Sequence, residues 1–325
     1  MTAEIIDIRT DRNGALDQAC AVLSQGFPVA IPTETVYGLA ADATNPSAIT
    51  RIYETKGRPR FNPLICHMAD VAMAERYASF DPISRRLAEA FWPGPLTLIL
   101  PLIPESGIHP LATAGLDTVG IRLPLGFAAD LIRAFGKPLA APSANTSGKV
   151  SPTSAGHVAG DLGSKLKLIL DGGASSVGVE STIVRVEGET VRLLRPGGVA
   201  AEEIEALIGR AVIRPEGPAA IIEAPGMLAS HYAPSAAVRL NATHVALGEA
   251  LIRLGSDPID GIEQATAVFN LSPAGDLAEA AANLFDYLKK ADAVGATRIA
   301  VTAIPDTGLG EAINDRLVRA AAPRE

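Results

Sequence analysis

Short apolar runs and amphipathic stretches alternate along the first two thirds of the chain, separated by glycine, proline and small polar residues. The apolar runs have the length of buried strands, and the amphipathic stretches repeat their apolar residues at helical spacing. This pattern predicts strands at 27–31, 62–67, 96–100, 119–124, 138–142, 167–170 and 191–195. The run 177–184 leads into a further strand, for which 191–195 is the predicted hairpin partner. It predicts helices at 16–23, 46–55, 70–78, 82–91 and 202–208.

Local signals support these helices. Asn45 precedes Pro46, which is the arrangement of a cap and a first helical residue. Trp92-Pro93-Gly94-Pro95 stops the helix over 82–91 and is predicted to be a structural turn.

Strand and helix alternation resumes after residue 239. Strands are predicted at 265–271 and 298–304. Asp276 is predicted to cap a helix, and a closing helix is predicted over 309–321. The stretch 308–316 is predicted to be a helix cap with surface charges, with a functional patch as the alternative.

A proline- and glycine-rich stretch at 209–237 separates the two parts of the chain. We therefore predict an α/β protein with a large domain at 1–208, a linker at 209–237 and a small doubly wound αβ domain at 238–325. The linker ends in Ser230-His231-Tyr232-Ala233-Pro234, and a spacer needs neither an aromatic residue nor a histidine. The linker is therefore either a spacer or a segment that folds back over a pocket.

Composition limits the classes of protein that fit. The chain has 325 residues, of which 48% are hydrophobic and 4% aromatic, and its net charge is −8. This argues against a disordered chain and against a basic nucleic-acid arm. No apolar run approaches the length of a membrane span, the N-terminus has no signal peptide, and the two cysteines form no CxxC motif. We expect a soluble cytoplasmic protein without a disulfide framework or a zinc site.

Polar clusters recur at the ends of the predicted strands. They are Thr33–Thr35, Lys56–His67 with three cations in its first five residues, Thr118 with Arg122, Ser143–Ser151, and Ser181 with Arg195. Groups at strand ends tend to meet on one side of a sheet, and lysine, arginine and hydroxyls together suit an anionic small molecule. Arg122 lies in an apolar strand, so it binds either a ligand or an internal carboxylate. The Ser143–Ser151 loop is read either as an ordinary turn or as part of the site.

The chemistry of these clusters favours one class of reaction. The sequence contains no Ser–His–Asp arrangement, no metal-ligand spacing and no evident covalent nucleophile. Phosphoryl and nucleotidyl transfer depend mainly on positioning and charge neutralisation, which cations and hydroxyls supply.

Several motifs together resemble the YrdC-type L-threonylcarbamoyladenylate synthases. They are PTETVYGL at 32–39, KGRP at 56–59 with NPL at 62–64, PSAN at 142–145 and EST at 180–182. The family's Lys-x-Arg and Ser-x-Asn tetrad is matched by Lys56, Arg58, Ser143 and Asn145, which would be the catalytic residues. The linker and the C-terminal αβ domain resemble the longer, two-domain form of that family.

The resemblance implies a fold and an activity. The first domain would be a twisted mixed sheet with helices on its faces and a concave pocket, and the second would be Rossmann-like. The enzyme would condense L-threonine, bicarbonate and ATP, with Mg2+ accompanying the triphosphate, and release pyrophosphate. Its product would pass to the machinery that attaches threonylcarbamoyl to adenosine beside the anticodon of tRNA, and a weak direct contact with tRNA is left open.

The resemblance also implies which residues bind each substrate. L-Threonine would be bound by Thr35, His67, Arg122, the Ala141 backbone and Ser181. Tyr232 would close over the nucleotide. The residues that would bind ATP and stabilise the negative charge developing in the reaction are Lys56, Arg58, Asn62, Thr118, Ser143, Asn145, Ser151 and Arg195.

Two other classes compete with this prediction. A non-catalytic RNA- or nucleotide-binding module of the same fold would need a basic surface and stacking aromatic residues, against which the net charge of −8 and the 4% aromatic content both count. A carbamoyl-transfer domain of the hydrogenase-maturation type would sit among zinc-finger-like and acylphosphatase-like segments, and this chain has neither.

Overall fold

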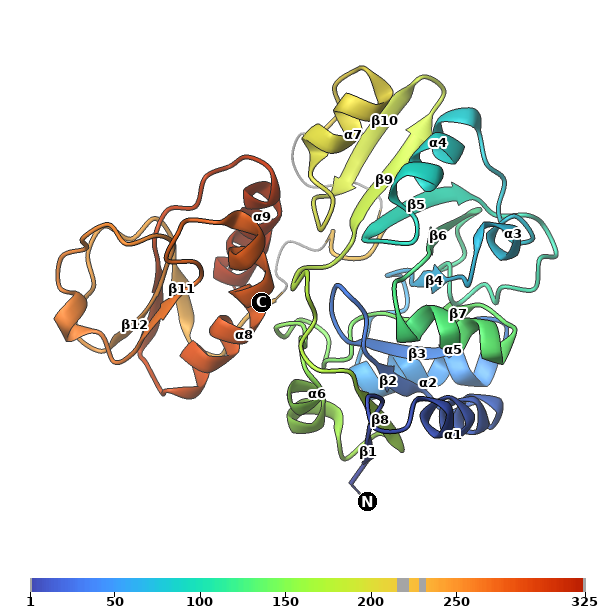
Figure 1. The fold of residues 1–325 in the computed structure, drawn as a ribbon, viewed down its shortest axis with the longest axis horizontal. Coiled ribbons are helices and arrows are strands. Elements are labelled where there is room, and N and C mark those ends of the chain that lie inside the picture. The colour runs from blue at the N-terminus through green and yellow to red at the C-terminus, as the bar shows by residue number, and fades with distance from the viewer. Residues whose placement is uncertain (1, 215–221, 228–231, 324–325) are drawn as a thin grey trace.

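The computed structural model describes residues 2–214, 222–227 and 232–323, and it contains a large and a small β-sheet. Figure 1 shows the two sheets side by side, with helices of the small unit between them. The prediction of an α/β fold with a mixed sheet and a smaller second sheet is confirmed.

The large sheet has ten strands in a mixed arrangement. In spatial order they are β1 (Glu4–Asp7), β8 (Leu168–Asp171), β2 (Val29–Ile31), β3 (Gly38–Asp42), β7 (Leu139–Ala140), β4 (Ile65–His67), β6 (Thr118–Arg122), β5 (Leu96–Pro101), β9 (Thr182–Glu187) and β10 (Thr190–Arg195). The pairs β1–β8, β2–β8, β4–β6 and β5–β9 are parallel, and the others are antiparallel. The predicted hairpin between β9 and β10 is present.

Seven helices accompany this sheet within the described residues. They are α1 (Arg12–Ser24), α2 (Pro46–Lys56), α3 (Val71–Ala74), α4 (Pro82–Phe91), α5 (Phe127–Phe135), α6 (Ala155–Leu162) and α7 (Ala201–Ile208). Asn45 caps α2 as predicted, because its side chain accepts hydrogen bonds from the backbone N–H groups of Ser47 and Ala48. The bounds predicted for α4 are confirmed.

Several predicted elements are shorter in the structure. The helix predicted over 70–78 has only one turn, α3, after which the chain enters turns. The strand predicted over 138–142 pairs only at Leu139 and Ala140, since the prolines at each end cannot donate to a ladder. The strands predicted over 265–271 and 298–304 also lose residues at their ends.

The small sheet has four parallel strands. In spatial order they are β11 (Ala237–Arg239), β14 (Arg298–Val301), β12 (Glu249–Arg253) and β13 (Val268–Asn270). Helices α8 (Leu277–Ala293) and α9 (Leu309–Ala321) pack against each other and against this sheet, and a short 3₁₀ helix, η1 (Ile262–Gln264), joins β12 to β13. Asp276 caps α8 as predicted, and the bounds predicted for α9 are confirmed.

The two parts of the protein share a buried core. Val36, Val150 and Val179 of the first part belong to the same hydrophobic cluster as Phe285 of α8 and Ile313 of α9. Helix α8 therefore lies directly against the loops of the larger sheet (Figure 1).

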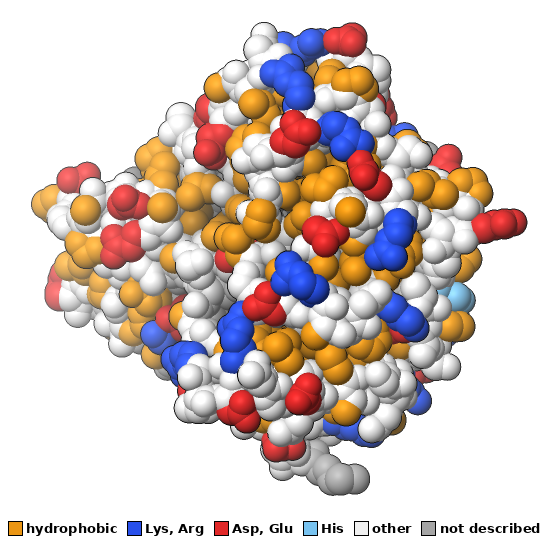
Figure 2. All heavy atoms as spheres, turned by 45° about the vertical axis from the view of Figure 1, so that its right-hand side comes forward, with side chains coloured by type: hydrophobic (Ala, Val, Ile, Leu, Met, Phe, Trp, Pro, Cys, Tyr) orange, Lys and Arg blue, Asp and Glu red, His pale blue; other side chains and the backbone are white. Residues whose placement is uncertain are grey.

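The surface carries charges of both signs. On the face shown in Figure 2, lysine and arginine side chains alternate with acidic ones and with apolar patches. Among the described residues, no helix is both long and apolar enough to span a bilayer.

Candidate active site

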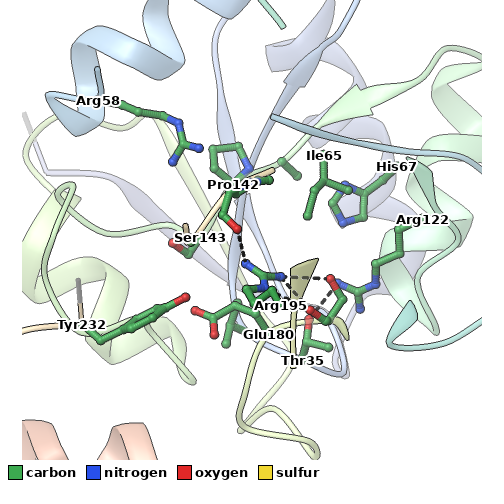
Figure 3. A pocket seen from close by; sticks show the side chains of 15 residues that line it. Thr35, Arg58, Ile65, His67, Arg122, Pro142, Ser143, Glu180, Arg195 and Tyr232 are labelled. Atoms are coloured by element: carbon green, nitrogen blue, oxygen red, sulfur yellow. Dashed lines mark hydrogen bonds between the residues drawn. The ribbon is translucent and has the colours of Figure 1, made fainter. Parts of the chain in front are cut away.

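A pocket lies where several loops at the strand ends of the large sheet meet. Nine of the predicted site residues line it: Thr35, Arg58, His67, Arg122, Ala141, Ser143, Ser181, Arg195 and Tyr232. Val36, Ile65, Pro142, Glu180, Pro225 and Gly226 complete the lining. Figure 3 shows Thr35, His67 and Arg122 gathered on one side, and Arg58 and Tyr232 on the opposite side. The pocket thus has two ends, both of them polar.

Arg122 is buried at the end of β6. Its Nη1 donates to Thr35 Oγ1 at 2.8 Å, and its Nε donates to the Gly94 carbonyl at 3.2 Å. Its Nη2 lies 2.7 Å from Glu34 Oε1, an ion pair whose angle is not that of a hydrogen bond. The internal carboxylate foreseen for Arg122 is therefore present, and the side chain also lines the pocket. Gly94 belongs to the predicted turn after α4, so this turn positions the arginine.

His67, at the end of β4, is 3% exposed. Burial, together with the nearby Arg122 charge, lowers the pKa of its imidazole from 6.5 to about 3. Its Nδ1 has no hydrogen-bond partner in the described parts of the chain. The pocket therefore contains a neutral imidazole rather than a cation.

Arg195 and Ser181 join β10 to the start of β9. The Arg195 guanidinium donates to the Ser181 carbonyl at 2.8 and 3.1 Å and contacts Ser181 Oγ at 3.2 Å. Ser181 Oγ is also 2.7 Å from Thr97 Oγ1. Both residues are buried, and burial lowers the pKa of Arg195 below its usual range. An anionic ligand would relieve this cost.

Arg58 approaches the pocket from the loop after α2. Its guanidinium donates to the Asn62 side-chain oxygen at 2.7 Å and to the carbonyls of Asn62 and Pro63 at 3.1 and 2.8 Å. Burial lowers the pKa of Arg58 to about 10. Asn62 does not line the pocket, but it fixes the arginine that does.

Lys56, the last residue of α2, is 1% exposed and does not line the pocket. Its Nζ donates to the carbonyls of Ser143 at 2.5 Å and Asn145 at 2.6 Å. Burial, and then the charge of Arg58, lower the pKa of Lys56 well below 10.5. The structure thus brings the predicted tetrad together, with the lysine holding the loop that carries the serine and the asparagine.

Three other predicted residues also lie outside the pocket lining: Asn145, Thr118 and Ser151. Thr118 begins β6, whereas Arg122 ends it, so the two are separated by the length of the strand. Ser151 donates to Glu180 Oε1 at 2.6 Å behind the lining. Ser230 and His231 of the linker lie outside the described residues.

Glu180 lines the pocket and was not predicted as a site residue, although it begins the EST motif. A carboxylate is unexpected in a site for anions, and only the structure reveals how its charge is balanced. Its Oε2 accepts from Arg316 Nε of α9 at 3.0 Å. The prediction of surface charges over 308–316 is wrong at Arg316, whose exposed fraction is 0%.

Linker residues also reach the pocket. Pro225, Gly226 and Tyr232 line it, and the Ala233 N–H donates to the Gly148 carbonyl at 2.9 Å. Within the described residues, no group of three or more His, Cys, Asp or Glu side chains could hold a metal ion.

Comparison with known families decides the classification. A model of the Sua5/YciO/YrdC family, described as "Telomere recombination", matches residues 21–197. A second model, described as "Threonylcarbamoyl-AMP synthase, C-terminal domain", matches residues 199–322. The chain belongs to the Sua5/YciO/YrdC family. The resemblance inferred from the motifs is confirmed, including its two-domain form.

Individual relatives support the classification of this chain in the Sua5/YciO/YrdC family. A threonylcarbamoyl-AMP synthase of Bacillus subtilis is 41% identical and covers 99% of this chain and 97% of its own. A crystal structure of Pyrococcus abyssi Sua5 complexed with L-threonine has a TM-score of 0.85 at 40% identity, covering 94% of each chain. A relative from Mycobacterium tuberculosis is 36% identical over 61% of this chain and 91% of its own, so it is too short to contain both parts.

Proposed function

We propose that this family member synthesises L-threonylcarbamoyladenylate from L-threonine, bicarbonate and ATP, releasing pyrophosphate. The observation that carries the proposal is the joining, in one pocket, of three buried arginines with a neutral histidine and the loop held by Lys56. Relatives at about 40% identity over the whole chain are enzymes of that name, which supports the same reaction here.

The reaction brings anions together. The threonine ammonium group first loses a proton, and the free amine then forms a bond to the carbon of bicarbonate with release of water. One oxygen of the resulting carbamate attacks the α-phosphorus. The bond between that phosphorus and the oxygen bridging to the β-phosphate breaks, and pyrophosphate leaves. Because carbamate and triphosphate repel each other, the site must supply positive charge in advance.

The end of the pocket that contains Thr35, His67 and Arg122 suits L-threonine. Arg122 lines this end of the pocket, so its guanidinium can hold the carboxylate of the substrate. His67 stays neutral at physiological pH, so it can hydrogen-bond the amine or hydroxyl without adding charge. We assign the Ala141 backbone and Ser181 to the same substrate because both line the pocket.

The end that contains Arg58, Ser143 and Tyr232 suits ATP. Arg58 and Arg195 are fixed by hydrogen bonds to backbone carbonyls, so their charges are in place before the substrate arrives. Lys56 and Asn145 shape the loop that presents Ser143, while Asn62 and Ser151 fix side chains of the lining. We propose that Thr118, which begins β6, contributes to ATP binding only indirectly, through the position of that strand.

Magnesium fits this arrangement only as a companion of the triphosphate. Glu180 is the one carboxylate among the described lining residues, and it is already engaged by Ser151 and Arg316. Phosphate oxygens and water would therefore supply most ligands of Mg2+, which would neutralise phosphate charge.

The division of the chain at 208 and 237 remains part of the proposal, with the linker closing the nucleotide end through Tyr232. We further propose that the enzyme acts in the cytoplasm and passes its product to the threonylcarbamoyl-transfer machinery for tRNA. A direct contact with tRNA would have to be local, since the net charge is −8.

Pyrophosphate release from ATP, measured with bicarbonate and each amino acid in turn, tests the proposal. We expect release that depends on threonine and bicarbonate and that falls at least about 100-fold in Arg58→Ala and Lys56→Ala. Arg210→Ala is the matched control, because Arg210 is exposed and pairs with Glu189. Tight ATP binding without turnover under any amino acid would instead support a non-catalytic nucleotide-binding module.

A further inference from the structure

One side chain of the small unit reaches the wall of the pocket. Arg316 of α9 has an exposed fraction of 0%, and it is the largest fully buried side chain among the described residues. A guanidinium stays buried only where hydrogen bonds and opposite charge compensate the loss of water. The groups that surround Arg316 therefore indicate its role in the protein.

The contacts of Arg316 converge on the pocket. Its Nε donates to Glu180 Oε2 at 3.0 Å, and its Nη1 donates to the Pro196 carbonyl at 2.6 Å and to Asp315 Oδ2 at 3.0 Å. Its guanidinium carbon lies 5.4 Å from the centre of the Tyr232 ring. Two of these partners, Glu180 and Tyr232, line the pocket.

Tyr232 is held from a second side by the same unit. Its ring stacks on Phe285 of α8, with centroids 5.4 Å apart and planes at 27°. Its backbone has a φ of 60°, a left-handed conformation that a bulky residue keeps only where its surroundings enforce it. Arg316 and Phe285 together supply such surroundings.

The charge of Glu180 needs compensation if the pocket is to bind anions. Its Oε1 accepts from the neutral Ser151, so Arg316 is the charged group that the described hydrogen bonds place on this carboxylate. Arg195 also acts electrostatically on Glu180, but loss of Arg316 would remove the cation that is hydrogen-bonded to this carboxylate. More of its negative charge would then oppose the triphosphate across a region of low dielectric.

We propose that Arg316 is a positioning residue for the ATP-binding end of the active site, acting through Glu180 and Tyr232. It neutralises the carboxylate and holds the tyrosine ring, so the small unit completes a pocket built by the large one. The proposal rests on the proposed function and gives the second unit a role in it.

An ion pair elsewhere between the two parts provides the control. Arg214 Nε donates to Glu311 Oε1 of α9 at 2.8 Å, and Arg214 Nη1 lies 3.3 Å from Glu205 Oε1 of α7. None of these three residues lines the pocket. Arg214→Met therefore breaks a tie between the same two units without touching Glu180 or Tyr232.

The experiment measures kcat and the KM values for ATP and threonine in full-length Arg316→Met, Arg316→Lys, Glu180→Gln, Glu180→Gln/Arg316→Met and Arg214→Met. We expect Arg316→Met to raise the KM for ATP about tenfold or more while the KM for threonine changes less than about threefold. Combining it with Glu180→Gln should shrink that effect, since the carboxylate that Arg316 pairs with is then replaced by a neutral amide. Arg316→Lys should retain part of the ATP affinity, and Arg214→Met should stay within about twofold of the wild type.

Several outcomes would overturn the proposal. One is a soluble Arg316→Met with lowered melting temperature but an unchanged KM for ATP, and another is an equal loss in Arg316→Met and Arg214→Met. If Arg316→Met does not fold, an unchanged KM for ATP in Arg316→Lys overturns it as well, since the lysine cannot reproduce the forked contacts. If the proposed function is wrong, the wild type will show no threonine-dependent pyrophosphate release. The effect of Arg316 is then measured as a change in affinity for a non-hydrolysable ATP analogue.

Discussion

The neutral His67 imidazole predicts that the large unit loses stability on mild acidification. The folded pKa of His67 is about 3, against 6.5 for an ordinary histidine. As pH falls below 6.5 the unfolded chain takes up a proton that the folded one cannot, so stability is complete above that pH and declines towards pH 3. At pH 5 the loss relative to pH 7.5 is about 2 kcal/mol. Because pH 5 lies well above the pKa of His67 in the folded protein, the size of this stability loss depends only on the pKa of histidine in the unfolded chain.

Urea unfolding at the two pH values, followed by tryptophan fluorescence, measures this loss. The chain has one tryptophan, Trp92, which ends α4 and donates to the Leu96 carbonyl of β5 in the same sheet as His67. His67→Gln is the control, since the other four histidines are present in both proteins. We expect the wild type to lose about 2 kcal/mol more than the variant between pH 7.5 and pH 5. Equal losses in the two proteins would refute the assignment of a buried, neutral His67.

Three further changes test other contacts. Lys56→Met should weaken ATP binding in calorimetry, because Nζ then no longer holds the carbonyls of Ser143 and Asn145 in place. Arg122→Lys should raise the KM for threonine about tenfold in the pyrophosphate assay, with the KM for ATP as the internal control. Gly178→Ala should destabilise the protein in thermal melts, because a Cβ there would lie 2.3 Å from Ala282 Cα of α8 at a φ of 76°. It should cost about 2 kcal/mol more than Gly188→Ala, whose φ is 61° and whose Cβ would meet nothing within 4 Å, and equal costs would contradict a close approach of the two units.

Local signals account for what the sequence predicted about the fold. Caps and helical periodicity located α2, α4 and α9, because each signal lies within a few residues of the helix that it starts. Strand β3 (Gly38–Asp42) was not predicted, since glycine and alanine give it little strand propensity. It is set instead by its antiparallel pairing with β2. The order of the ten strands also depends on such pairings between distant segments.

The candidate site likewise contains residues that the sequence located and a pairing that it did not reveal. The KGRP motif located Arg58, and the polar clusters at strand ends located Arg122 and Arg195; all three line the pocket as expected. These patterns did not reveal the pairing of Glu180 with Arg316, because 136 residues separate the two and a charged helix residue is usually exposed. Burial of that arginine follows only from the docking of α9, which no local pattern encodes.

The structure also explains why the motifs contain residues that do not line the pocket. Lys56 holds the carbonyls of Ser143 and Asn145, and Asn62 holds the guanidinium of Arg58. Each of these contacts fixes a group that would otherwise need to be ordered when an anion binds, and ordering at that moment would weaken the binding. The KGRP and PSAN motifs are therefore one unit, in which a buried lysine couples the two loops. On this argument, a substitution at Lys56 should disturb ATP binding through Ser143, although Lys56 itself does not line the pocket.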